Sequence, residues 1–190
     1  MDTPFLGDRK YQGHNFTRTR LPKGEYENCD FTGCDFSGGY LDSTHFLECH
    51  FEDCNLSNAN LKFTRFKETE FLRCKMLGLR FEDLDDFLLS FRFKDCALNL
   101  CSFVDMKLRQ TVFEGCILMG ADFTGADANG SSFDGCDLQN AIFWQSGLGG
   151  TDFRNAVNFN IDPENNDLKK ARFNREALPG LLTKYSLEIE

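Results

Sequence analysis

The sequence predicts a solenoid built from five-residue repeats, and the spacing of its large and small residues predicts it. From Phe16 to Phe81 every fifth residue is large and apolar, and the spacing resumes from Leu88 to Phe153 after a shift of two residues. Neither a strand, with its period of about 2 residues, nor a helix, with about 3.6, produces this pattern. Two positions before the large residue the chain carries a small one, and all nine cysteines fall there.

A second period of twenty residues appears when the two-residue insertion is removed, and it sorts the large residues into four columns. We expect the first column to form a stack of rings spaced by about 4.8 Å. The first column is Phe31, Phe51, Phe71, Phe93, Phe113, Phe133 and Phe153. The second runs from Phe16 to Leu138 and the third from Leu21 to Phe143. The fourth is Tyr26, Phe46, Phe66, Leu88, Leu108, Ala128 and Leu148.

Phrases such as Cys54-Asn55-Leu56-Ser57-Asn58 and Ala121-Asp122-Phe123-Thr124-Gly125 resemble the pentapeptide-repeat family. The pattern of that family is a small residue, Asp or Asn, Leu or Phe, and two polar residues. The resemblance covers residues 14–157. It implies an all-β fold, a right-handed quadrilateral parallel β-helix in which four pentapeptides make one square coil.

The chain divides into three parts. Residues 1–13 are polar and irregular and are expected to be an N-terminal cap, and residues 14–157 to be the β-helix, with its insertion near residues 82–87. Residues 158–190 are expected to form a distorted last coil, a short helix and a strand. Pro179 restricts the helix to starting near residue 175 or at 179 itself. The alternation in Ser186-Leu187-Glu188-Ile189-Glu190 predicts the strand.

Four residues of the helix, at i, i+3, i+4 and i+7, form one apolar stripe that must be buried. Its partner is either the last coil of the same chain or the same helix of a second molecule, which would make a homodimer. The segment from Ala177 to Ile189 is similar to the end of the Qnr-type quinolone-resistance proteins, which implies dimerisation there, and Cys74-Lys75-Met76-Leu77-Gly78 is similar to their mid-chain segment. The candidate cap or dimer residues are Leu178, Leu181, Leu182, Tyr185, Leu187 and Ile189.

No catalytic constellation and no cofactor site is predicted. His45 and His50 occupy outward positions while Cys49 points inward, so these three side chains cannot converge on a metal. The cysteines stack with parallel side chains rather than in the crossed geometry of a disulfide, so we expect reduced thiols in the core.

The charge pattern restricts the partners. The net charge of −9 argues against direct binding of nucleic acid, and the chain has neither a leader-like start nor an apolar run long enough for a membrane span, so a cytoplasmic protein is expected. Between Gln110 and Thr151 there is no Lys or Arg. The candidate acidic partner-binding surface is Glu114, Asp122, Asp127, Asp134, Asp137 and Asp152. An alternative is that Asp before the large residue serves the backbone turn.

Three classes of function follow. The Qnr-type resemblance implies a DNA mimic that binds DNA gyrase or topoisomerase IV and gives quinolone protection, with a dimer joining two acidic surfaces into one rod about 70 Å long. The alternative is a generic scaffold or protein-interaction module with an unrelated partner. An enzyme ranks last, because a filled β-helix supplies no cleft with converging polar groups.

Overall fold

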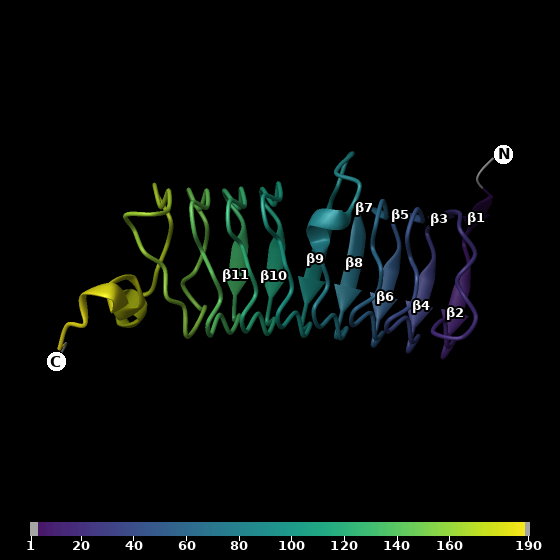
Figure 1. The fold of residues 1–190 in the computed structure, drawn as a ribbon, viewed down its shortest axis with the longest axis horizontal. Coiled ribbons are helices and arrows are strands. Elements are labelled where there is room, and N and C mark those ends of the chain that lie inside the picture. Colours follow the sequence, from purple (N-terminus) through teal and green to yellow (C-terminus); the bar gives the residue numbers. More distant parts are fainter. Residues whose placement is uncertain (1–3, 189–190) are drawn as a thin grey trace.

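The protein is a rod of stacked coils in a computed structural model that describes residues 4–188 (Figure 1). Two parallel sheets run along it, in the orders β11-β10-β9-β8-β6-β4-β2 and β1-β3-β5-β7. Single parallel bridges such as Asp35 to Asn55 and Ser102 to Asp122 join the coils elsewhere. The predicted fold class, an all-β right-handed quadrilateral parallel β-helix, is confirmed. The strands are β1 (Phe5–Gly7), β2 (Lys10–Gln12), β3 (Glu25–Glu27), β4 (Asp30–Thr32), β5 (His45–Leu47), β6 (His50–Glu52), β7 (Arg65–Lys67), β8 (Thr69–Leu72), β9 (Phe91–Lys94), β10 (Val112–Glu114) and β11 (Ser132–Asp134).

The register follows the repeat. Phe31 pairs with Phe51, and Phe113 with Phe133, so one coil is twenty residues. Phe71 pairs with Phe93, so the coil that contains the insertion has twenty-two. No helix in the described part of the chain is long and apolar enough to cross a membrane.

Two backbone devices turn the chain at the corners. The second residue after the large one has a positive φ, for example 51° at Asn28 and 55° at Asn58. In many repeats the Asp or Asn before the large residue closes the turn with its side chain, as where Asp35 Oδ1 accepts a hydrogen bond from the Ser37 N–H at 3.0 Å. Asn and Asp suit both positions, because they tolerate the left-handed conformation and bond to the backbone two residues on.

Aromatic rings fill the centre of the rod. Along the predicted column from Phe31 to Phe153, neighbouring ring centroids lie 4.6 to 5.3 Å apart with planes within 22° of parallel. Rings of the third column meet this stack edge-on, as where Phe113 and Phe123 make an angle of 89°. Offset stacking within a column and edge-to-face contact between columns are the two arrangements that aromatic pairs prefer.

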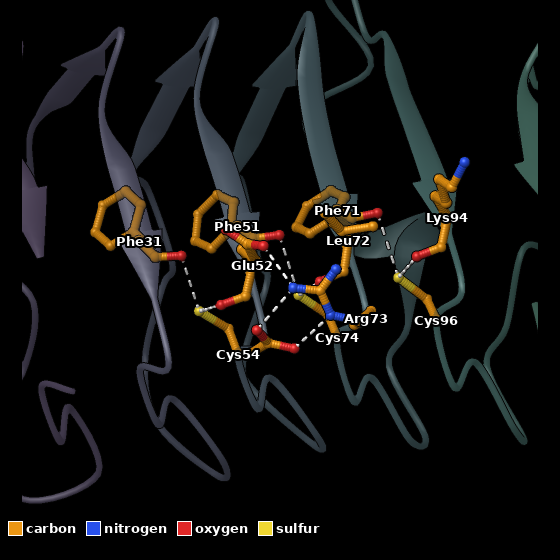
Figure 2. A network of polar contacts seen from close by, with 11 residues as sticks. Phe31, Phe51, Glu52, Cys54, Phe71, Leu72, Arg73, Cys74, Lys94 and Cys96 are labelled. Atoms are coloured by element: carbon orange, nitrogen blue, oxygen red, sulfur yellow. Dashed lines mark hydrogen bonds and ion pairs between the residues drawn. The ribbon is translucent and has the colours of Figure 1, made fainter. Parts of the chain in front are cut away.

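The small inward residues also donate hydrogen bonds. Figure 2 shows the thiol of Cys54 bonding to the Phe31 carbonyl at 3.2 Å and that of Cys74 to the Phe51 carbonyl at 3.3 Å. Hydroxyls at the same position do the same, as where Thr64 bonds to Leu41 at 2.8 Å. Cysteine here is therefore a small buried residue with a weak donor that reaches the coil before it.

The N-terminal segment differs from the expected irregular cap. Strands β1 and β2 pair with β3 and β4, and the ring of Tyr11 stacks on Phe31 at 4.7 Å. The reason is visible in the spacing: Leu6 and Tyr11 precede Phe16 by ten and five residues and continue the repeat. The regular coil stack thus begins before residue 14.

The insertion displaces one expected core residue. Leu88, placed in the fourth column by the sequence, is 58% exposed and has a φ of 54°. The chain leaves the coil through the 3₁₀ helix η1 (Phe81–Asp83), and the following segment projects from the rod (Figure 1). Leu84 and Leu89 pack against the core instead. A column derived from spacing alone cannot say which residues of an insertion return to the core.

The C-terminal end also departs in part from expectation. Two 3₁₀ helices, η2 (Arg175–Leu181) and η3 (Thr183–Tyr185), replace the expected α-helical stripe, and η2 starts at one of the two predicted places. A 3₁₀ helix has about 3 residues per turn, so the four apolar residues do not line up on one face. No strand forms at residues 186–188, where Ser186 has a φ of 48°, and Ile189 lies outside the described residues.

Candidate functional site

The histidines and cysteines form no metal-binding cluster in the part of the chain that the structure describes. His45 lies 3.4 Å from Glu25 on the outer surface, while the Cys49 thiol turns inward and donates to the Tyr26 carbonyl at 3.3 Å. All nine cysteines are free and buried. Burial raises the pKa of Cys49 and that of Cys101 to about 12, so both thiols stay protonated and unreactive at neutral pH.

The six acidic candidates do not form one surface. Glu114 and Asp134 are register partners on β10 and β11. Asp152 lies on the same face one coil further, where it bridges to Ser132, and Asp137 lies around the next corner, where it bridges to Ile117. Asp122 bridges to Ser102 on another face, and Asp127 bridges to Lys107 on the remaining one. The twenty-residue columns already separate them, since Asp122 precedes Phe123 of the third column and Asp127 precedes Ala128 of the fourth. The base-free stretch did not define one surface, because it is longer than one coil and passes through all four faces.

Most of these carboxylates already have partners. Asp122 closes a turn with the Thr124 N–H at 2.8 Å. Glu114 pairs with Lys94 at 2.6 Å, Asp127 with Arg109 at 2.6 Å, and Asp152 with Arg154 at 2.8 Å and Arg172 at 3.4 Å. The Arg154 hydrogen bond lowers the pKa of Asp152. Burial raises the pKa of Asp127, but hydrogen bonds from Asn129 and Arg109 outweigh it and lower the pKa overall. Lys and Arg side chains from outside residues 110–151 thus pair with acids inside this stretch.

One corner gathers four acids, of which Glu114 is the one paired with a base in the part of the chain that the structure describes. Asp95, Glu114, Asp134 and Asp137 lie along the edge that follows strands β9 to β11, and we call them the acidic strip. Within residues 4–188, Asp134 and Asp137 are held by the side-chain amides of Asn155 at 2.6 Å and Asn158 at 2.9 Å rather than by a base. Asp95 was missed by the sequence analysis, because it follows Lys94 and lies outside the base-free stretch.

Basic and acidic side chains alternate along one column of the seven-stranded sheet in the N-terminal half, a pattern that was not predicted from the sequence. Lys10 lies 3.2 Å from Asp30, and His50 lies 3.7 Å from Asp30 and 3.8 Å from Glu70. Arg92 completes the column at 3.0 Å from Glu70. Reading every twentieth residue with the two-residue insertion removed would have found it. Asp30 and Glu70 therefore each have a charged base one coil away, Lys10 for Asp30 and Arg92 for Glu70.

The C-terminal helices dock on the last coil. Lys184 reaches Asp162 and Glu164, both at 2.7 Å, and the Tyr185 hydroxyl donates to Glu164 at 2.7 Å. The Gly180 carbonyl accepts from the Ile161 N–H at 3.0 Å. Ala177 and Leu181 pack against the core, whereas Leu178, Tyr185 and Leu187 are 43%, 49% and 57% exposed. The apolar residues of this end are thus divided between the chain's own core and the surface.

Comparison with known proteins agrees with the repeat pattern. A model of the pentapeptide repeat region matches residues 24–87, and a model of eight pentapeptide repeats matches residues 116–155. The curated proteins contain no match. Two trypsin-treated structures of QnrB1, a plasmid-mediated fluoroquinolone resistance protein, are similar at 19% identity, with TM-scores of 0.67 and 0.64. They cover 98% and 100% of this chain, and this chain covers all of both. At this identity the likeness shows the fold.

Proposed function

Because the chain belongs to the pentapeptide-repeat family, we propose that it acts without catalysis as a DNA mimic that binds a type II topoisomerase, DNA gyrase or topoisomerase IV, and protects it from quinolones. The observation that carries this proposal is the similarity of the whole coil stack to QnrB1, whose described role is fluoroquinolone resistance. The net charge of −9 on an elongated rod supports it, because a basic DNA-binding cleft attracts such a surface.

The acidic strip is the part of the rod that we assign to the basic cleft. Asp134 is exposed, and neither it nor Asp137 has a base within ion-pair distance in residues 4–188, so the charge of both is available to a partner. Asp122 differs in lying on another face, although its carboxylate closes a turn as that of Asp137 does with the Gln139 N–H at 3.0 Å. Long-range attraction from the strip would raise the association rate and weaken with salt.

A DNA supercoiling assay with purified gyrase, with and without a fluoroquinolone, tests the proposal. We expect the protein in stoichiometric excess to restore supercoiling in the presence of the drug. The variant carrying Asp134→Asn and Asp137→Asn should need several times more protein, and Asp122→Asn is the matched control, because Asn keeps the turn. If an excess of the protein leaves supercoiling unchanged in the presence of the drug, the proposal is wrong.

A generic scaffold is the second candidate, and exposed apolar side chains favour it. Ile142 and Trp144, which flank Phe143 of the third column, are 49% and 47% exposed. Val157, which bridges to Asp137 beside the second column, is 51% exposed. A partner bound there would bury apolar surface rather than match charge. In that case the Asp134→Asn, Asp137→Asn variant binds its partner as tightly as the parent, while Trp144→Ser weakens binding.

A further inference from the structure

The insertion creates a recess on the side of the rod. Residues 81–89 turn outward through η1 and lie beside the corner formed by residues 104–107 of the next coil. The recess between them has a volume of about 540 Å³. Recesses of this size are typical of sites for small molecules. The segment that makes it is the one place where the sequence departs from the five-residue repeat between Phe16 and Phe153.

Apolar side chains form most of its wall. They are Phe81, Leu84, Leu88, Leu89, Val104 and Met106. Leu88 is 58% exposed and is held with a positive φ, so its side chain stands at the mouth of the recess without being part of the core. A ligand with an apolar body would remove this surface from water, which favours binding.

A carboxylate with an unsatisfied oxygen lines the same recess. Glu82 Oε1 lies 3.1 Å from the Arg80 guanidinium, but Glu82 Oε2 is buried and has no hydrogen-bond partner within residues 4–188. A buried carboxylate oxygen without a donor is costly, because it has lost water and gained nothing in exchange. Oε2 itself is closed to a ligand, but the Glu82 side chain is 21% exposed, so its negative charge acts on whatever occupies the recess.

The remaining charges of the recess favour a cation. Asp86 and Asp105 join Glu82 on the lining, and Lys107, whose ammonium lies 3.0 Å from Asp86, is the base among the lining residues. The lining therefore keeps a negative balance that repels anions. We propose that this recess binds a small organic ammonium ion with an apolar body, whose charge is balanced by Glu82, Asp86 and Asp105 while the body covers Leu84, Leu88 and Met106. The proposal does not depend on topoisomerase binding.

Methyl NMR titration of the full chain tests it, with phenethylammonium as the probe and 2-phenylethanol as its neutral counterpart. We expect saturable shifts of the Leu84, Leu88 and Met106 methyls, with an affinity for the ammonium roughly tenfold or more above that for the alcohol. Glu82→Gln should reduce this preference, and Glu48→Gln, a matched change at an exposed residue outside the recess, should keep it.

Three outcomes would overturn the proposal: no shift at millimolar probe, equal affinity for the two probes, or an unchanged preference in Glu82→Gln. Thermal unfolding of each variant establishes that it is folded. Leu88→Ser, a change at an exposed side chain, provides a variant that does not touch the charge. It should weaken both probes equally, and unchanged binding of both probes would also contradict the site.

Discussion

At the corners of the rod, some residues with a Cβ adopt an unfavourable left-handed conformation although their side chains are largely exposed. Leu100 has a φ of 57° and is 66% exposed, and Phe63 has a φ of 59° and is 60% exposed. The left-handed conformation costs a residue with a Cβ about 1 kcal/mol or more, whereas glycine adopts it freely. The corners of this rod are therefore positions where the repeat could be improved.

Replacing Leu100 by Gly should leave the free energy of unfolding unchanged or raise it by up to about 1 kcal/mol, because relief of the positive φ outweighs the entropy of glycine. Urea unfolding measures the change. Gly120→Ala is the opposite case, since Gly120 has a φ of 65° and an added Cβ would meet Leu100 Cδ2 at 2.8 Å. It should lower the stability, and a Leu100→Gly variant destabilised as much as Gly120→Ala would contradict the argument.

The inward thiols are the second contribution that single residues make. Cys74 is fully buried and donates to the Phe51 carbonyl, as Thr64 and Ser131 do to theirs at Leu41 and Leu108. Cys74→Ser should therefore be tolerated better than Cys74→Ala, which loses the bond and leaves a small void at a cost of about 1 kcal/mol. Chemical denaturation of the two variants decides, and a serine variant less stable than the alanine variant would show that the donor is irrelevant.

At the scale of elements, most of the fold could be predicted from the repeat, whereas the structure at the ends of the repeat could not. Phe31 and its column could be placed because side-chain direction recurs with the coil, whatever the neighbours are. Leu88 could not, because an insertion frees its residues from that period. The columns assign each acid of residues 110–151 to a face, but the stretch itself does not show the bases that pair with these acids from outside it, such as Arg109. The terminal helix type depended on Pro179 and on docking to residues 159–165, which no local pattern shows.

The docking of the terminal helices depends on a charge cluster that should respond to pH. The hydrogen bond from Lys184 lowers the pKa of Asp162 and that of Glu164. Because these values are depressed in the folded chain, the stabilisation is complete above the unfolded pKa of about 4 and is lost as the pH falls through the folded values.

We therefore expect the end of the rod to loosen at acid pH before the coils do. The amide signal of Ile161, which bonds to the Gly180 carbonyl, should shift below about pH 4 while that of Phe113 in β10 stays in place. Lys184→Met should produce the acid-like Ile161 signal already at pH 7. An Ile161 signal that moves only together with that of Phe113 would mean that the end and the coils unfold as one unit.

At the scale of the whole molecule, the C-terminal end of the rod combines a cap with exposed apolar surface. The last coil is covered by η2 and η3, which use Ala177 and Leu181 for their own docking. Leu178, Tyr185 and Leu187 remain exposed beside them, so the cap that closes the solenoid also offers apolar surface to a second molecule. Capping of the chain's own last coil and dimerisation, the two alternatives left open by the sequence, are thus compatible. Ala177 and Leu181 serve the cap, and the exposed residues remain available for a second molecule.

The mass of the protein in solution tests the dimer on which the long DNA-mimic surface depends. A homodimer through the C-terminal end should scatter light as twice the 21.7 kDa of one chain. Leu178→Glu should return it to the monomer without loss of stability, since this side chain is 43% exposed and takes no part in the core. Leu100→Glu, a similar change far from the end, is the control. A monomeric parent protein at micromolar concentration would exclude the joined rod, and topoisomerase binding would then have to rest on the acidic strip of a single chain.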